Sequence, residues 1–330
     1  MNATRREGTG ITARPPRVLL RGSGDPGPAV VVYRLESGPH RQTGVVVEVS
    51  IDDYRGGRIR RHEATQPARV RELEEQAEAT GVERMPVMLV HRGHLSIADL
   101  TAETPTARLH DGGATHTVWI RRDEAGARAL CDEIGRIGNL YIADGHHRML
   151  AADRYAARRG LGSGHPSAYT LAALFPSDEM RILGYHRCFA LAPGSTARDV
   201  LDRLAEHPLT ERIEESPAAD TEPGVVAIGV GDRWYRLRLR ASGVLDAFAI
   251  EQELLPKLHD LTAAEADAAP DRQHAVETCW CDGRNAFRLI PHPPTIDQVL
   301  TTSDEGRPMP PKSTWFDPKP TAELFRRPLI

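Results

Sequence analysis

The stretch NLYIADGHHRMLAADRY, from Asn139 to Tyr155, places an acid, a glycine, two histidines and an arginine between an apolar run and a helical pattern. Gly145 would let the backbone approach a ligand closely. Free N–H groups in the first turn of a helix bind anions, and the guanidinium of Arg148 offers a planar fork of donors to phosphate or carboxylate. This order of residue types is typical of a phosphate-binding turn.

The other polar residues of this turn suit the same chemistry. Asp144 is a candidate magnesium ligand, because hard cations take carboxylate oxygens and leave other positions to water and phosphate. His146 and His147 can donate to phosphate oxygens or carry protons. Alternatively, Asp144 only caps the helix and the histidines lie on the surface. Capping explains Asp144 but not the three residues after Gly145, so we favour phosphate binding.

A second dense run, RRHE at residues 60–63, falls in a predicted loop. Loops on a rigid sheet often present reacting groups. Glu63 could act as a general base near a substrate hydroxyl, and Arg60 or Arg61 could neutralise anionic charge. Taken alone, the run is better explained as a solvated charged surface.

A metal site that joins the two runs is a third alternative, because histidine and carboxylate suit zinc, manganese or iron. Its ligands would be His62, Glu63, Asp144, His146 and His147. Adjacent histidines rarely face one ion, so this alternative ranks below phosphate binding.

Two other phosphate-binding patterns fail on context. Gly22, Gly24 and Gly27 spell G-x-G-x-x-G, but a β-branched run follows them instead of a helix, so we assign the segment to a turn. Lys312, Ser313 and Thr314 match only the end of a P-loop motif and lack its glycine-rich loop.

Hydrophobic patterns around these runs predict alternating strands and helices. We expect an antiparallel hairpin over residues 29–52 and helices that end at Gly81 and Gly160. The other predicted strands cover residues 85–91, 115–123, 139–144, 167–175, 182–191, 224–230, 233–240 and 285–290, the last being the final strand; the other predicted helices cover residues 124–138, 192–207, with Ser195 or Thr196 as cap, and 244–259.

Composition bounds the class of protein. The 330 residues are 40% hydrophobic, enough to bury a sizeable core. We expect a flexible leader over residues 1–27, a domain over 28–191, and a smaller α+β domain over 192–330 with a Pro-rich tail.

A net charge of -4 provides no global basic field, so we expect neither nucleic acid nor membrane as a partner. The four scattered cysteines favour the cytoplasm, and a homodimer is compatible with the sequence.

Several separated segments resemble the prokaryotic domain-of-unknown-function family 1015. They occur in the family's order from about Pro28 to the C-terminus: PAVVVYRLESG, IDDYRGGRIRRHEATQPAR, LYIADGHHR, RILGYHR and MPPKSTWFDPK. The Asp-Gly-His-His-Arg block is similar to the signature of the ParB/sulfiredoxin-like superfamily, which includes free serine kinases. The resemblance implies an α+β fold in which a ParB-like mixed sheet with helices forms the domain over residues 28–191.

The resemblance also implies a site. Phosphates and Mg²⁺ would lie at Asp144, Gly145, His146, His147 and Arg148, and Lys312, Ser313 and Thr314 would reach the same cleft. The family's usual N-terminal region, with its Pro-Pro-Tyr-Asp-Val-like block, has no counterpart here. In the serine kinases an N-terminal glutamate serves as base, so Glu63 is the remaining candidate.

These inferences predict a Mg²⁺-dependent phosphotransferase. A nucleotide, ATP or ADP, would donate a phosphoryl group to the hydroxyl of a small amino acid such as serine. Asp144 would hold the metal, Arg61 and the Gly145–Arg148 turn the phosphates, and Glu63 the acceptor proton, with His147 close to the reacting groups. The alternative is a non-catalytic nucleotide-binding switch.

Overall fold

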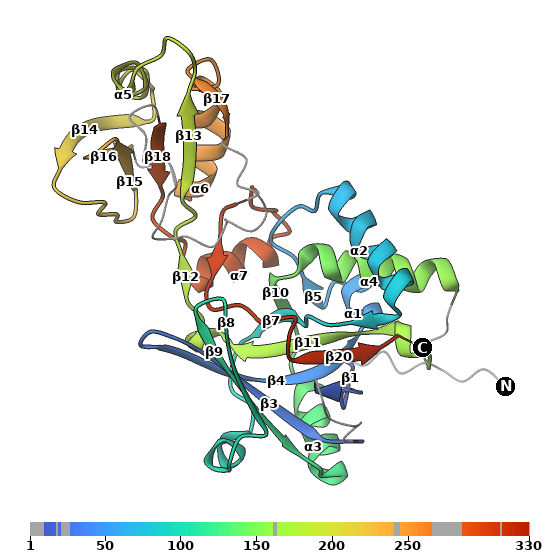
Figure 1. Cartoon of the computed structure of the whole chain (residues 1–330). Helices are drawn as coiled ribbons and strands as arrows, with labels where there is room; N and C mark the ends of the chain where they lie inside the picture. Colours follow the sequence, from blue (N-terminus) through green and yellow to red (C-terminus); the bar gives the residue numbers. More distant parts are fainter. Residues whose placement is uncertain are drawn as a thin grey trace. The chain divides into compact units, whose positions relative to one another are not determined.

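A computed structural model describes residues 10–17, 19–20, 27–160, 164–240, 245–265, 286–310 and 312–329. It consists of two compact units, each described below by itself (Figure 1). The first contains residues 1–181, 300–308 and 316–330, and the second contains Ile182–Val299 and Met309–Trp315. The chain leaves the first unit after Arg181; whether residues 28–191 and 192–330 fold as separate domains stays a prediction.

The first unit is built on a nine-stranded mixed sheet, which confirms the predicted α+β class. β5 pairs with β10 and β7 pairs with β11 in parallel, and the other pairs are antiparallel. In sheet order the strands are β5 (Ile59–Arg60), β10 (Leu140–Asp144), β7 (Val87–His91), β11 (Tyr169–Pro176), β4 (His40–Ser50), β3 (Val30–Ser37), β9 (Ala114–Arg121) and β8 (Ala107–Asp111), and β1 (Ala13–Arg14) pairs with β4.

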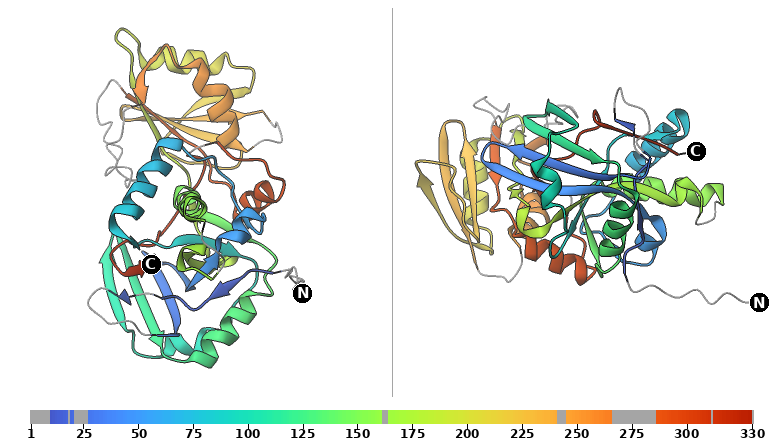
Figure 2. Two further views of the ribbon diagram at one scale, coloured as in Figure 1. Left: turned by 90° about the vertical axis from the view of Figure 1, so that its right-hand side faces the viewer. Right: turned by 90° about the horizontal axis from the view of Figure 1, so that it is seen from below.

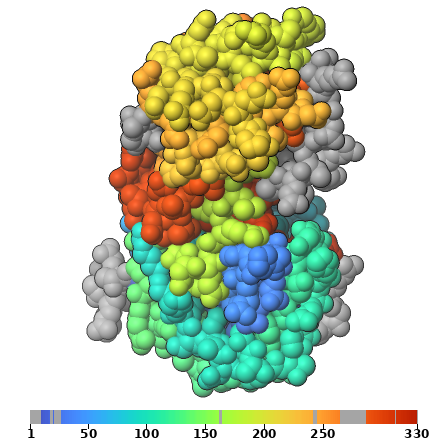
Figure 3. Space-filling view, turned by 90° about the vertical axis from the view of Figure 1, so that its left-hand side faces the viewer, coloured from blue at the N-terminus to red at the C-terminus, as the bar shows by residue number. Residues whose placement is uncertain are grey.

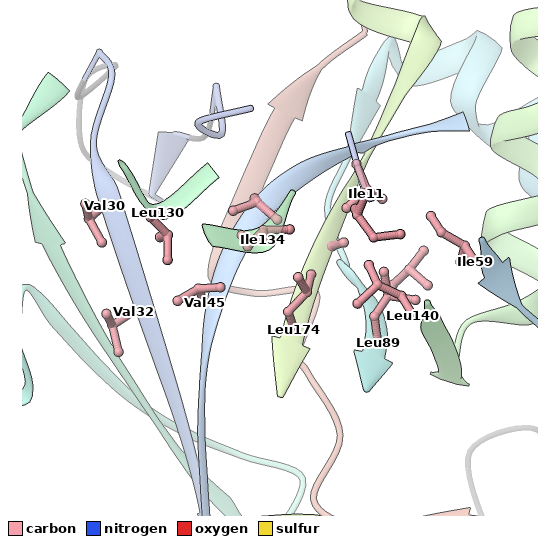
Figure 4. Packing of buried hydrophobic residues seen from close by; sticks show 14 of the residues in the cluster. Ile11, Val30, Val32, Val45, Ile59, Leu89, Leu130, Ile134, Leu140 and Leu174 are labelled. Atoms are coloured by element: carbon pink, nitrogen blue, oxygen red, sulfur yellow. The ribbon is translucent and has the colours of Figure 1, made fainter. Parts of the chain in front are cut away.

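One buried cluster of this unit lies on the face of the sheet where α3 packs near β1 and β3 (Figures 2 and 4), and alternate strand residues such as Val46 and Phe175 are buried on the other face. The central strands are continuous apolar runs, which suits strands that are covered on both sides. The helices of the unit are α1 (Ile51–Arg55), α2 (Pro67–Thr80), α3 (Glu124–Ile134) and α4 (His146–Arg159), with the 3₁₀ turns η1 (Ala98–Ala102), η2 (Pro166–Ala168) and η3 (Ser177–Glu179). Gly81 and Gly160 end α2 and α4 in the left-handed conformation, as predicted.

The predicted hairpin is confirmed, but its second strand stops at Ser50 and a short helix follows. The Ser50 side chain accepts a hydrogen bond from the Asp52 N–H, and two acidic residues occupy the first turn of α1. The predicted leader also needs correction, because Ala13–Arg14 and Leu19–Leu20 are paired strands. The Thr12 N–H donates to Asp53 at 2.6 Å and helps to hold this segment. Gly22 and Gly24 lie outside the described residues.

Residues 285–290 do not supply the last strand, because the Pro-rich tail contains two more. β20 (Phe325–Pro328) pairs with β2 (Leu19–Leu20) and β6 (Val82–Glu83), and β19 (Trp315–Phe316) pairs with β12 (Ile182–Leu183). Arg327 is fully buried and forms ion pairs with Glu48 at 3.0 Å and Glu83 at 2.7 Å. These buried ion pairs fix the position of the tail. The pattern of apolar residues in the sequence does not predict this position.

The second unit is a six-stranded antiparallel sheet with helices packed on one face. Thr196 and Asp199 form a capping box at α5, which confirms the predicted cap. In sheet order the strands are β14 (Thr210–Ser216), β16 (Arg233–Leu239), β15 (Val225–Val230), β18 (Ala286–Ile290), β13 (Arg187–Leu191) and β17 (Thr262–Glu265); the helical segments are α5 (Ala197–Ala205) and α6 (Asp246–Ala249), which continues as the π-helix η4 (Ile250–Leu254) and the 3₁₀ turn η5 (Leu255–Lys257). α7 (Ile296–Asp304) follows β18, and its residues from Leu300 on belong to the first unit.

The strand predicted over residues 182–191 is instead two strands, β12 and β13, with a break at Gly184. A Cβ atom at Gly184 would lie 2.4 Å from the carbonyl oxygen of Pro291, so the close approach of these backbones requires glycine.

Two features bear on the predicted compartment. Cys131 is a free thiol, whereas Cys188 is disulfide-bonded. Disulfides are uncommon in a reducing cytosol, so the cytoplasmic location stays a prediction. None of the helices described is long and apolar enough to cross a membrane.

Candidate phosphate-binding site

The Asp-Gly-His-His-Arg block lies at the junction of β10 and α4, as predicted. Gly145 has a φ of 100° and is the N-cap of α4, where no side chain caps the helix. A Cβ atom at this position would lie 2.8 Å from Nη2 of Arg148. Glycine is therefore required both by the backbone conformation and by the guanidinium that folds over it. Because Asp144 does not cap the helix, the capping alternative is wrong.

Asp144 is held between two cations. Its Oδ2 lies 2.8 Å from Nη2 of Arg148, and its Oδ1 lies 3.0 Å from Nζ of Lys319. Burial alone would raise the pKa of this carboxyl, but Lys319 and Arg148 outweigh burial and hold it well below its usual range. Asp144 is thus ionised, and two side-chain cations lie beside the first turn of α4.

The two histidine-containing runs meet through a buried pair of rings. His62 and His146 make an edge-to-face contact at 4.6 Å between centroids, and Phe316 lies 6.0 Å from His62. Burial lowers the pKa of His62 to about 4, although a hydrogen bond to the backbone of Ile142 opposes it. Burial, followed by His62, also holds the pKa of His146 well below its usual value. Both rings are neutral at pH 7, and the prediction of surface histidines in the capping alternative is wrong for His146.

His147 joins the starts of two helices. Its Nε2 accepts a hydrogen bond of 2.9 Å from the N–H of Gln66, the N-cap of α2. Because the backbone N–H is the donor, Nδ1 carries the imidazole proton and can donate to a ligand. Burial and then Arg69 lower the pKa of His147, which keeps this tautomer neutral.

The N-termini of α2 and α4 therefore lie next to each other, and the two helices pack against each other at an angle (Figures 1 and 2). Neither N-cap makes a side-chain cap hydrogen bond. Two positive helix ends thus coincide with Arg69, Arg148 and Lys319 in one region of the first unit. Such an arrangement favours anions, phosphates in particular.

A cavity of about 340 Å³ adjoins this region between α2 and α4. Arg69 and Arg148 line it together with the rings of Tyr155 and Tyr169, and Gln76 adds an amide. Most of the other lining is apolar. Pockets of this kind accept small molecules with one charged end. Tyr155 and Tyr169 come from α4 and β11 and line one cavity only in the folded chain.

The remaining predicted site residues differ in exposure and in their contacts. Arg61 is exposed and hydrogen-bonds to Tyr54, while Glu63 is half-buried and directly follows His62. Arg60 forms an ion pair with Asp304. The role of Glu63 as a base stays a prediction, but the contact of His62 with His146 brings its segment to the site.

Lys312, Ser313 and Thr314 belong to the second unit. Ser313 is buried and its hydroxyl donates to Pro310 at 2.6 Å. Their approach to the phosphate-binding turn stays a prediction. Sequence reasoning missed Lys319, although one signal existed: the chain has only three lysines, and two fall in MPPKSTWFDPKP.

The alternative metal site is not formed. Across the part of the chain that the structure describes, no group of three or more His, Cys, Asp or Glu side chains could hold a metal ion.

A family model for proteins of unknown function, DUF1015, matches residues 23–262, well over half of the chain. The chain belongs to this family. No curated protein matches its sequence.

Solved structures with a similar fold include SbnI with a C-terminal truncation from Staphylococcus aureus, at a TM-score of 0.49 and 13% identity over 86% of this chain and 87% of that one. A free serine kinase variant in complex with ADP has a TM-score of 0.41 and 15% identity over 87% and 92%. A conserved hypothetical protein from Pyrococcus furiosus has a TM-score of 0.37 and 14% identity over 84% and 94%. No function follows from similarity at this level.

In this DUF1015 chain, the sequence motifs most specific to the family lie in different units. The Arg-His-Glu and Asp-Gly-His-His-Arg blocks meet in the first unit through His62 and His146, and the Pro-Pro-Lys-Ser-Thr block belongs to the second.

Proposed function

We propose that this protein transfers a phosphoryl group from a nucleotide, ATP or ADP, to the hydroxyl of a small amino acid such as serine. The observation that carries the proposal is the pairing of Asp144 with Arg148 and Lys319 beside the uncapped N-terminus of α4. Phosphoryl transfer depends mainly on positioning and charge neutralisation, and these groups supply both.

The phosphates would lie against the first turn of α4. The N–H groups after Gly145, the guanidinium of Arg148 and Nδ1–H of His147 are all donors, and Arg61, which hydrogen-bonds to Tyr54, would add positive charge. The ammonium of Lys319 would move from Asp144 to a phosphate oxygen. The cavity that contains Tyr155 and Tyr169 would accept the rest of the nucleotide or the acceptor.

Asp144 fits a shared magnesium site. Mg²⁺ is usually bound by one or two carboxylates together with substrate phosphates and water, and Asp144 is the ionised carboxylate at this turn. When bound, Mg²⁺ would neutralise charge that develops on the phosphates. The release of Lys319 from Oδ1 would open a coordination position on Asp144.

Glu63 is the proposed base. In the reaction the acceptor hydroxyl would give its proton to Glu63 while its oxygen forms a bond to the terminal phosphorus, and the bond from phosphorus to the leaving nucleotide breaks. The donor would leave as ADP or AMP. The proposal of serine as the acceptor rests on the resemblance of the Asp-Gly-His-His-Arg block to that of free serine kinases. A cytoplasmic location would fit this chemistry.

A second candidate is a non-catalytic switch that dimerises or regulates another protein when nucleotide binds. The burial of His62 and His146 favours this alternative, because neither ring can exchange a proton with a substrate.

Titration calorimetry of ATP, ADP and CTP with Mg²⁺, together with phosphorus NMR of a mixture that contains serine, tests the proposal. We expect wild type to bind nucleotide and form phosphoserine, and Asp144→Asn to lose both. Asp153→Asn is the matched control, because Asp153 lies on α4 and pairs with Arg55 away from the turn. Tight binding without turnover would favour the switch, and absence of binding to wild type would refute both.

A further inference from the structure

His91 is a buried histidine that the proposed reaction does not use. Met88 on β7 pairs with Asp144, and His91 ends the same strand three residues later, about 10 Å further along. Its side chain is 1% exposed. Nδ1 lies 3.3 Å from the carbonyl oxygen of Arg92, whereas the buried Nε2 has no hydrogen-bond partner among the residues that the structure describes.

The hydrogen bond fixes the chemistry of Nε2. A carbonyl oxygen only accepts, so Nδ1 is protonated and Nε2 presents a lone pair. Burial lowers the pKa of His91, so the ring stays neutral. A buried acceptor without a donor costs free energy, and a ligand that carries a donor would remove that cost.

His91 lines two adjoining cavities, which share His94 and Leu95. The smaller one, of about 310 Å³, has an apolar wall that includes Ile97, Leu174 and Pro176. We refer to it as the His91 cavity. Its other side is formed by the β3–β4 hairpin and by Glu179 of η3, and Figure 3 shows the blue hairpin beside the yellow-green end of β11.

Two arginines line this cavity, and neither forms a direct ion pair with a described residue, although Glu36 and Glu179 act on Arg34 at longer range. Arg34 donates from Nε to Oγ1 of Thr43 at 3.1 Å and lies over the ring of Trp119. Arg41 makes neither an ion pair nor a side-chain hydrogen bond to any other described residue. Burial first, and then the charge of Arg41, lowers the pKa of Arg34. Two arginines that line one cavity without a direct ion pair favour an anion there.

Glu179 limits the charge of that anion. One of its oxygens accepts a hydrogen bond of 2.6 Å from the N–H of Thr43, and its negative charge acts on Arg34. His94 is paired with Asp178. Two arginines and one glutamate leave the lining of the His91 cavity with roughly one positive charge, which matches a monoanion better than a phosphate dianion.

We propose that the His91 cavity binds a small carboxylate that carries a hydrogen-bond donor, namely an α-hydroxy or α-amino acid. The carboxylate would lie between Arg34 and Arg41, its donor would face Nε2 of His91 or Glu179, and a short apolar side chain would contact Leu174 and Pro176. This site is separate from the phosphate-binding turn and does not rest on the proposed kinase activity.

Titration of the full-length protein with L-lactate, L-alanine, propionate and inorganic phosphate, followed by nitrogen NMR of its histidine rings, tests the proposal. We expect saturable binding of lactate or alanine that shifts the Nε2 signal of His91. Propionate has no donor and should bind about tenfold more weakly, which is the effect of one lost hydrogen bond. Preference for lactate would indicate the hydroxyl class, and preference for alanine the amino class.

Three variants separate this site from its surroundings. Arg41→Gln should weaken binding about tenfold. Arg108→Gln is the matched control and should change the affinity less than about twofold. Arg108 is an exposed arginine of the same sheet that does not line the cavity. Its Nε donates to Thr117, as Nε of Arg34 donates to Thr43. Asp144→Asn should leave binding intact.

Four results would overturn the proposal. They are the absence of saturable binding of both acids, equal losses in Arg41→Gln and Arg108→Gln, loss of binding in Asp144→Asn, and tighter binding of phosphate than of either acid. The third result would place the ligand at the phosphate-binding turn. Failure of this proposal leaves the nucleotide titrations unaffected.

Discussion

Lys319 gives Asp144 a cationic partner from a distant part of the chain, whereas Arg148 comes from the same helix four residues later. We predict that Lys319→Met weakens ADP binding about tenfold, because one charge-assisted hydrogen bond to phosphate is lost. Calorimetry with ADP and Mg²⁺ measures the effect. Lys257→Met, which removes an exposed lysine of the second unit, should bind ADP like wild type. Unchanged affinity in Lys319→Met would contradict the role of Lys319.

At this scale, sequence reasoning could place only residues that share one local element. The order Asp-Gly-His-His-Arg predicts which side chains crowd the first turn of a helix, since spacing within a helix is fixed. It cannot show that Lys319 pairs with Asp144, or that His62 contacts His146 edge to face. Those contacts depend on the path of a loop and of the tail. Lys312→Met in the ADP titration therefore tests the original prediction for that residue.

The strand β20 depends on one buried cation. Arg327 is 0% exposed and neutralises Glu48, which is equally buried, and Glu83. We predict that Arg327→Met lowers the free energy of unfolding by about 3 kcal/mol, because it leaves buried carboxylates short of a partner. Arg326→Met on the exposed side of the same strand should change it by less than about 0.5 kcal/mol. Urea denaturation compares them, and equal effects would show that the ion pairs do not hold the tail.

The same strand explains what element prediction could and could not achieve. Strands such as Val87–His91 and helices that end at Gly81 or Gly160 were predictable, because apolar runs and left-handed glycines are local signals. β20 has no such signal in the sequence Phe325–Pro328, and its partners are strands of two residues. Its position follows from ion pairs between residues far apart in the sequence.

Across the whole molecule, the buried neutral histidines make the stability of the fold depend on pH. His62 has a pKa of about 4 in the folded protein because it is buried, whereas the unfolded chain has the ordinary value near 6.5. Between these values the unfolded state binds a proton that the folded state does not, so stability falls as the pH falls. The lowered pKa of Asp144 changes the free energy of unfolding only below about pH 4. Asp144 therefore does not contribute to a comparison of stability between pH 7.5 and pH 5.

We predict that moving from pH 7.5 to pH 5 costs wild type about 2 kcal/mol more of unfolding free energy than it costs His62→Phe. Phenylalanine keeps an aromatic ring against His146 and Phe316 but cannot bind the proton. Urea unfolding of both chains at the two pH values measures the difference. The contribution of His147 cancels between the two chains, and His146 keeps burial, the largest cause of its lowered pKa, in both. If the two chains lose equal stability, burial does not oppose the protonation of His62. His62 would then be accessible to solvent, and the site would not contain a buried pair of neutral histidines.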